Sequence, residues 1–143
     1  MDFMSSMDTL TLPARMDSLE TFLDFVLKKA EPAGASETLL YDIRLALEEI
    51  LVTIFSYAYP DEEGHVTLSF SAQSDGRLKI KISDRGIPFD PLALDAPDLT
   101  EEFSERKIGG LGIYLTRTVA HEILYQRDCN ANHLTVFFLL CPD

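Results

Sequence analysis

The chain has 143 residues, 46% of them hydrophobic, which suits one compact domain that spans residues 1–143 and buries a core. With 24 acidic and 12 basic residues it carries a formal charge of −12. This charge argues against nucleic acid and anionic membranes as main partners, because both need a basic surface, and a basic protein partner fits better. The two cysteines and the N-terminus show no disulfide, export or membrane-spanning pattern, so we expect a cytoplasmic protein.

The first third of the chain predicts a strand and two helices. Residues 9–12 alternate between polar and apolar side chains, which is typical of a strand. Asp17 or Ser18 then caps a helix that runs to about Lys29 and has lysines at its C-terminal end. A second and longer helix follows a Ser36 cap and carries apolar residues at helical spacing, which we expect to face the core.

The rest of the chain predicts a sheet and a third helix. Residues 66–70 and 78–82 alternate strictly, and a Ser-Asp-Gly turn joins them as a hairpin. Each strand has one apolar and one polar face, so helices should cover one side of the sheet. A helix at about 110–122 and strands at about 123–127 and 134–140 complete the pattern. The fold class is therefore α+β, a two-layer arrangement.

Asp84 is the first candidate site residue. The alternation of the preceding strand places its carboxylate on the inward face, where an unpaired charge is costly and needs a hydrogen-bond donor. The alternative is that the strand ends at Ser83 and that Asp84 starts a turn with Arg85 and Gly86, a common use of aspartate. Alternation alone does not decide between the two.

Glycines gather in two turns. Four of the seven lie within residues 84–91 and 109–114. A Gly-Gly-x-Gly turn that opens a helix suits phosphate, because main-chain N–H groups can approach an anion closely there. Arg106 and Lys107 place two cations just before the second turn. The alternative is a solvated charge pair in front of an ordinary glycine-rich turn.

An acidic pair, Glu48 and Glu49, lies inside the second helix. The helical rotation of about 100° per residue directs the two side chains to opposite flanks of the apolar stripe. Glu49 shares its flank with Thr53, four residues on. Only one flank can face a pocket, and a solvated helix edge is the simpler interpretation of such a pair.

Five segments, in this order and spacing, resemble the bacterial anti-sigma-factor serine kinases of the GHKL ATPase superfamily. They are residues 45–52, 58–60, 84–91, 108–115 and 132–135. The resemblance extends from about residue 9 to residue 140. It implies a Bergerat fold, a sandwich in which helices cover one face of a mixed, mostly antiparallel sheet, with a flexible ATP lid at about 92–108. It also implies a homodimer.

The resemblance assigns nucleotide-binding roles to individual residues. Asp84 matches the carboxylate that accepts a hydrogen bond from the adenine amino group, and Gly86 matches a glycine that lets the base lie close to the backbone. Gly110 and Gly112 match the glycines that open a helix against the phosphates. Thr135 matches a hydroxyl near the adenine end of the pocket.

The cofactors that the resemblance implies are ATP and Mg²⁺. Glu49 matches the general base that accepts the proton of a substrate serine, and Arg106 is a lid cation placed to reach phosphate. One residue departs from the pattern, because Thr53 stands where the family has an asparagine that coordinates Mg²⁺. A threonine hydroxyl can ligate Mg²⁺, but its reach is shorter, so nucleotide binding can persist while phosphoryl transfer slows or is lost.

Three functions follow from these assignments. The first is an ATP-binding anti-sigma regulator that phosphorylates a serine on a STAS-type anti-sigma-factor antagonist and sequesters a sigma factor. The alternative, prompted by Thr53, is a catalytically weak or inactive nucleotide-gated binding module. The ATP-binding fragment of a histidine kinase is a weaker third, because nothing before residue 36 resembles a two-helix phosphoacceptor domain.

Overall fold

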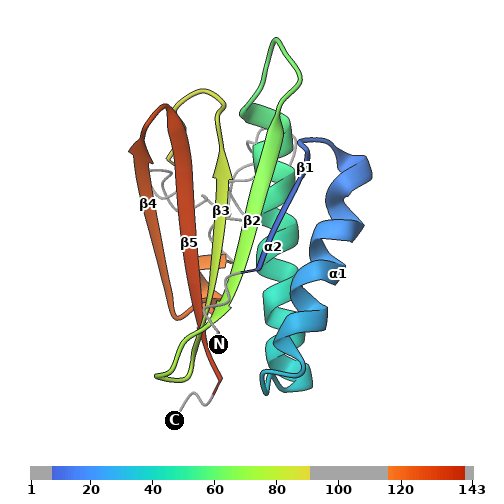
Figure 1. Cartoon of the computed structure of the whole chain (residues 1–143), viewed down its shortest axis with the longest axis vertical. Helices are drawn as coiled ribbons and strands as arrows, with labels where there is room; N and C mark the ends of the chain where they lie inside the picture. The colour runs from blue at the N-terminus through green and yellow to red at the C-terminus, as the bar shows by residue number, and fades with distance from the viewer. Residues whose placement is uncertain (1–7, 91–115, 141–143) are drawn as a thin grey trace, which may run out of the picture.

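The computed structural model describes residues 8–90 and 116–140 of the chain (Figure 1). In chain order the elements are β1 (Asp8–Pro13), a 3₁₀ helix η1 (Met16–Ser18), α1 (Leu19–Ala30), α2 (Glu37–Tyr57), β2 (His65–Ala72), β3 (Arg77–Asp84), β4 (Glu122–Asp128) and β5 (Ala131–Leu139). A helical stretch at 116–119 precedes β4. The helix expected to reach residue 122 therefore ends earlier, at Val119.

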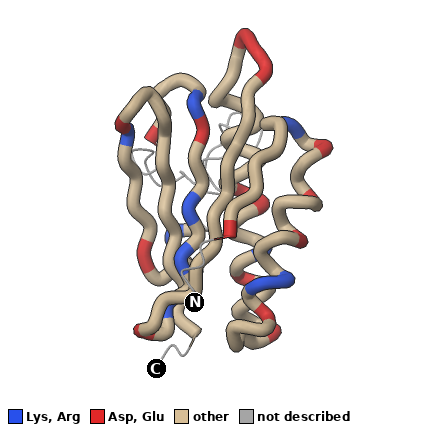
Figure 2. The backbone as a smooth tube through the Cα atoms, in the orientation of Figure 1, with Lys and Arg blue, Asp and Glu red and all other residues tan. Residues whose placement is uncertain are grey.

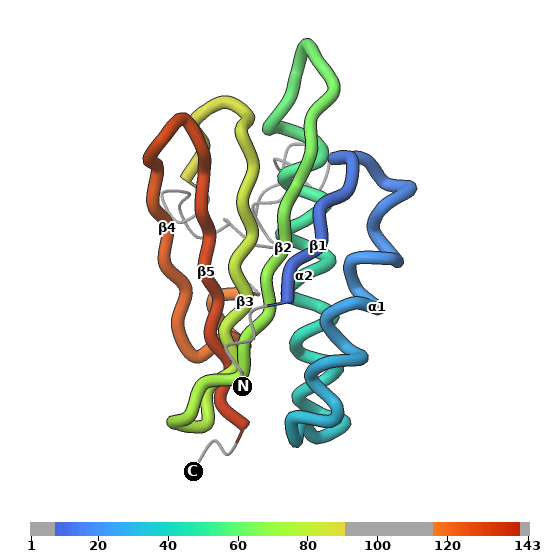
Figure 3. Tube along the Cα trace, in the orientation of Figure 1, coloured from blue at the N-terminus to red at the C-terminus, as the bar shows by residue number. Residues whose placement is uncertain are grey.

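The strands described form one sheet of five in the order β1-β2-β3-β5-β4. Each neighbouring pair is antiparallel, and β5 lies between β3 and β4. Figures 1 and 3 show the strands side by side, with α1 and α2 forming a second layer. The expected α+β sandwich, with helices on one face of the sheet, is confirmed, and no parallel pair occurs among these described strands.

Side-chain alternation determines which face of the sheet is buried. The alternate, inward-facing apolar positions of β2, β3 and β5 are at most 5% exposed, and they are Val66, Leu68, Phe70, Leu78, Ile80, Ile82, Leu134, Val136 and Phe138. They form one core with the apolar stripe of α2 and with Phe22 and Leu23 of α1. Burial of each large side chain contributes about 1.5–3 kcal/mol, so this alternation fixes the register of the sheet.

The two helices begin differently. Ser36 precedes α2, and its Oγ accepts a hydrogen bond from the N–H of Leu39 at 3.1 Å, which confirms the expected cap. Ser18 precedes α1, but its side chain makes no cap bond, because the chain enters this helix through a 3₁₀ turn. Arg44 of α2 donates to the carboxylate of Glu20 of α1 at 3.0 Å and joins the two helices.

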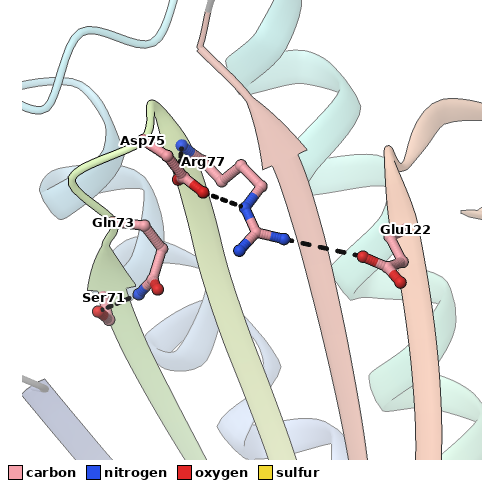
Figure 4. Close-up of polar contacts among 5 residues, drawn as sticks. All are labelled: Ser71, Gln73, Asp75, Arg77 and Glu122. Atoms are coloured by element: carbon pink, nitrogen blue, oxygen red, sulfur yellow. Dashed lines mark hydrogen bonds and ion pairs between the residues drawn. The ribbon is translucent and has the colours of Figure 1, made fainter.

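The face of the sheet that points away from the helices is polar, and the Arg77 side chain lies across it. Arg77 lies over the ring of Phe137 at 4.4 Å, and it pairs with Asp75 at 2.9 Å and Glu122 at 3.8 Å (Figure 4). Acidic residues line α1, α2 and the loop at 61–63, whereas basic residues occur along β3 (Figure 2). Among the described residues, no helix has both the length and the apolar character needed to cross a bilayer.

Candidate functional site

Asp84 combines the two roles that the sequence leaves open. It is the last residue of β3, it continues the buried positions of that strand, and it is only 6% exposed. Its Oδ1 also accepts a hydrogen bond from the N–H of Gly86 at 2.9 Å, which is the local turn that aspartate commonly starts. The same carboxylate therefore both points inward and starts the turn.

Asn132 supplies the second donor to this carboxylate. It pairs with Asp84 in the β3–β5 register, and its Nδ2 donates to Asp84 Oδ1 at 3.0 Å and to the carbonyl of Ile87 at 2.8 Å. Its Oδ1 accepts from the Tyr125 hydroxyl at 2.6 Å and from the N–H of Phe89 at 3.3 Å. The amide thus uses all four of its hydrogen-bonding positions. No described residue donates to the other oxygen of Asp84, Oδ2.

Asp84 and Asn132 help to line a narrow cavity of about 20 Å³ between α2 and the sheet. Its apolar lining comprises Ile50, Ile54, Ala58, Ile82 and Leu134, and its remaining lining residues are Thr53, Asp84, Phe89, Tyr125 and Asn132. A carboxylate oxygen without a donor in such surroundings is costly, so the site fits a ligand that brings an N–H group.

The cavity is small compared with an adenine ring, since about 20 Å³ holds little more than a single water. Binding of a base therefore requires lining side chains to move. Phe89 is only half-buried, and its ring stacks on Tyr57 at 5.8 Å between centroids. Of the lining residues in this turn, Asp84 is buried and Phe89 is partly exposed, so Phe89 is the side chain that we expect to move.

Close packing requires glycine at position 86, a requirement that the resemblance does not suggest. A Cβ at this position would lie 2.6 Å from both the carbonyl carbon and the Cβ of Ala58, and closer still to the Ala58 carbonyl oxygen. The same carbonyl accepts a hydrogen bond from the N–H of Ile87 at 2.9 Å. The absent side chain lets the turn press against the end of α2, a role separate from the expected approach of a base.

Thr53 and Glu49 lie one turn apart on α2. Thr53 is 2% exposed and lines the cavity, and its hydroxyl donates to the carbonyl of Glu49 at 2.9 Å. Glu49 is half-buried, and burial raises its carboxyl pKa, with a smaller contribution from the neighbouring charge of Glu48. A raised pKa brings a carboxylate closer to the range in which a general base works at neutral pH.

Mg²⁺ has little support from the described residues. The hydroxyl of Thr53 is buried and already donates to the helix backbone. In the ranges that the structure covers, no group of three or more His, Cys, Asp or Glu side chains is placed to hold a metal. Thr53 is therefore a poor direct ligand for Mg²⁺, an ion that in nucleotide sites usually takes only one or two protein ligands besides phosphates and waters.

Thr135 does not reach the cavity. Its neighbours Leu134 and Val136 point into the core, so Thr135 points to the opposite face, beside Lys81 in the register. The structure thus corrects the expected placement of this hydroxyl near the adenine end of the pocket. Asn132 and Leu134 take the inward positions, and the alternation of Leu134, Val136 and Phe138 already predicts an inward Asn132.

Part of the expected site lies outside the described residues. This holds for Arg106, Gly110 and Gly112, and for the lid expected at about 92–108. Within the described ranges, the structure brings Thr53 and Asp84 into one cavity, with Glu49 one helical turn away.

Comparison with known proteins assigns the chain to a family. A family model described as the histidine kinase-like ATPase domain matches residues 12–138. The chain belongs to the histidine kinase-like ATPase domain family. That match covers most of the chain, and the resemblance to the anti-sigma-factor serine kinases is confirmed by named relatives.

Two of these relatives of the histidine kinase-like ATPase domain are kinases by name. The serine-protein kinase RsbW of Listeria monocytogenes is 27% identical over 125 residues, which are 84% of this chain and 79% of that protein. The serine/threonine-protein kinase BtrW of Bordetella bronchiseptica is 29% identical over 109 residues, 76% of each chain.

Solved structures share the fold of this histidine kinase-like ATPase domain. The RsbU and RsbW domains of Rv1364c from Mycobacterium tuberculosis align with a TM-score of 0.65 and 16% identity, covering 94% of this chain and 32% of that one. The histidine kinase domain of Erythrobacter litoralis EL346 aligns with a TM-score of 0.53 and 18% identity, covering 97% and 70%. This chain therefore spans about a third of the first of these solved chains.

Proposed function

We propose that this chain is an ATP-dependent anti-sigma-factor serine kinase in which Asp84 recognises adenine. The observation that carries the proposal is the buried carboxylate whose Oδ1 has two donors and whose Oδ2 has none among the described residues. The adenine amino group would supply the donor that Oδ2 lacks. The family match and the two kinases named among the relatives support the same assignment.

Glu49 is the proposed general base. Its raised pKa suits a carboxylate that takes the proton from a substrate serine as the serine oxygen attacks the γ-phosphorus of ATP. The new O–P bond replaces the bond to the β–γ bridging oxygen, and ADP leaves with those electrons. Arg106, Gly110, Gly112 and a lid at about 92–108 are proposed to hold the phosphates. Mg²⁺ bound with ATP would neutralise charge on the phosphates, and Thr53 would offer it only a poor direct ligand.

The proposed protein substrate is a serine on a STAS-type anti-sigma-factor antagonist, and the proposed second partner is a sigma factor. The formal charge of −12 supports a partner with a basic surface. From the resemblance we also propose a homodimer in the cytoplasm.

Transfer of label from ATP to the antagonist tests the kinase proposal. Wild type should phosphorylate the antagonist, and Glu49→Gln should lower the rate by about 100-fold or more, the usual contribution of a general base. Glu48→Gln is the matched control on the neighbouring position and should keep most of the rate. If wild type binds ATP but transfers no label, the kinase proposal is wrong, whereas absence of ATP binding refutes the nucleotide site itself.

A second function, a nucleotide-gated binding module without catalysis, is favoured by Thr53. The hydroxyl is buried and engaged with the helix backbone, so it is a poor replacement for an asparagine ligand. In this case wild type would bind ATP without transfer, and Thr53→Asn would gain transfer to the antagonist. Efficient transfer by wild type would exclude this second function.

A further inference from the structure

Asn132 joins three parts of the candidate site. Its four hydrogen bonds reach the end of β3 through Asp84, the turn through Ile87 and Phe89, and β4 through Tyr125. The residue is 5% exposed and lines the cavity. Because every polar atom of its amide is committed, the side chain has one orientation, and the groups bonded to it are held in turn.

The bond to Asp84 determines how that carboxylate is presented. Asn132 and the N–H of Gly86 both donate to Oδ1. Two donors on one oxygen fix the rotation of the carboxylate and leave Oδ2 as the acceptor available to a ligand. A carboxylate held in this way favours a base that offers an N–H group and disfavours one that offers a carbonyl oxygen at the same place.

We infer that Asn132 is a positioning residue that sets the preference of this site for adenine over guanine nucleotides. The inference rests on the proposed ATP site. Adenine has an amino group at the ring position where guanine has a carbonyl. A fixed Oδ2 accepts a hydrogen bond from the adenine amino group and repels the guanine carbonyl oxygen. Without Asn132, Asp84 can turn, and its oxygen can move away from a guanine carbonyl.

The experiment compares ATP and GTP affinities by calorimetry for wild type, Asn132→Ala and Asn130→Gly. Asn130 lies two residues away in an exposed turn with a φ of 62°, which glycine accepts, so its replacement is a control for the same hairpin. Wild type should prefer ATP. Asn132→Ala should bind ATP about tenfold or more weakly and lose about tenfold or more of the ATP-to-GTP preference, the size expected for hydrogen bonds to a charged group. Asn130→Gly should change neither.

The outcomes separate this inference from the proposed function. If wild type binds ATP and folded Asn132→Ala keeps the wild-type preference, Asn132 has no positioning role and only this inference fails. If wild type binds neither nucleotide, the proposed function fails and the inference falls with it. Asn132→Leu has a similar volume and offers no donor to Asp84, so it replaces Asn132→Ala if that variant does not fold, and the same loss of preference is expected.

Discussion

Replacement of Gly86 by alanine tests whether the turn after β3 is held by packing. The added Cβ would lie 2.6 Å from two atoms of Ala58, well inside van der Waals contact, and a backbone carbonyl cannot move aside as a flexible side chain can. The turn must shift, and the 2.9 Å bond from Ile87 N–H to the Ala58 carbonyl is lost or lengthened.

The size of the effect follows from these two terms. Overpacking costs about 1–3 kcal/mol, and the lost hydrogen bond adds about 1 kcal/mol, so Gly86→Ala should lower the free energy of unfolding by about 2–4 kcal/mol. With a urea slope of about 1–3 kcal/mol/M, the unfolding midpoint should fall by about 0.7–4 M, or about 1.5 M at the middle of both ranges.

Urea unfolding of the protein without nucleotide, followed by circular dichroism, measures this shift. Arg85→Ala is the matched control, because the side chain of Arg85 is exposed and surface changes usually stay within about 0.5 kcal/mol. If Gly86→Ala unfolds at the wild-type midpoint but no longer binds ATP, the glycine serves the approach of a ligand, and the packing argument is refuted.

Three further predictions concern helix caps, a titrating carboxyl and a turn. Ser36→Ala should lower the free energy of unfolding by about 1 kcal/mol, because it removes the cap bond to Leu39, and Ser18→Ala should cost less, because Ser18 makes no cap bond; thermal unfolding of both compares them. The raised pKa of Glu49 means that the folded state holds its proton more tightly than the unfolded state, so stability falls as pH rises from the ordinary value of 4.5 through the raised pKa. Glu49→Gln should therefore be more stable than wild type at pH 7 and equal to it below about pH 4 in urea titrations, and a gain that persists in acid would contradict this. Asn130→Gly should raise stability by a few tenths to about 1 kcal/mol in the same assay, because Cys129 and Asn130 both have positive φ in the β4–β5 turn; a loss would show that the Asn130 side chain stabilises the turn.

Alternation in the sequence predicts much of the sheet, because burial of one face requires a period of two. The inward positions of 66–70 and 78–82 are buried as expected, and the same parity correctly places Asp84 on the inward face. The sequence also predicts the Ser36 cap from residue type and position alone. These features are local, so they can be inferred without the tertiary structure.

Features that depend on distant contacts are not predictable in this way. The clash that excludes a side chain at Gly86 involves Ala58, which is far away in the sequence. The role of Asn132 depends on its register opposite Asp84, although alternation from Leu134 gives its direction. Thr135 shows the limit of motif transfer, because matching a hydroxyl to a box does not establish which face of the strand it occupies.

The early end of the helix before β4 is also caused by a contact with a distant residue. Neither glycine nor proline occurs in the ten residues after Val119, so no local signal marks the boundary. The N–H of His121 instead donates to the carbonyl of Phe137 at 2.8 Å, which draws the chain into the sheet. A tertiary hydrogen bond therefore ends the helix where the periodicity predicts that it continues.

The most direct test of the account is a calorimetric titration of ATP into wild type and Asp84→Asn side by side. The substituted amide keeps the shape of the side chain and an oxygen for the N–H groups of Gly86 and Asn132, but it presents N–H where Oδ2 stands. Wild type should bind ATP saturably, and Asp84→Asn should bind it about tenfold or more weakly, as expected when a hydrogen bond to a charged group is lost. Equal affinities, or no binding by wild type, would contradict the assignment of Asp84 as the residue that recognises adenine.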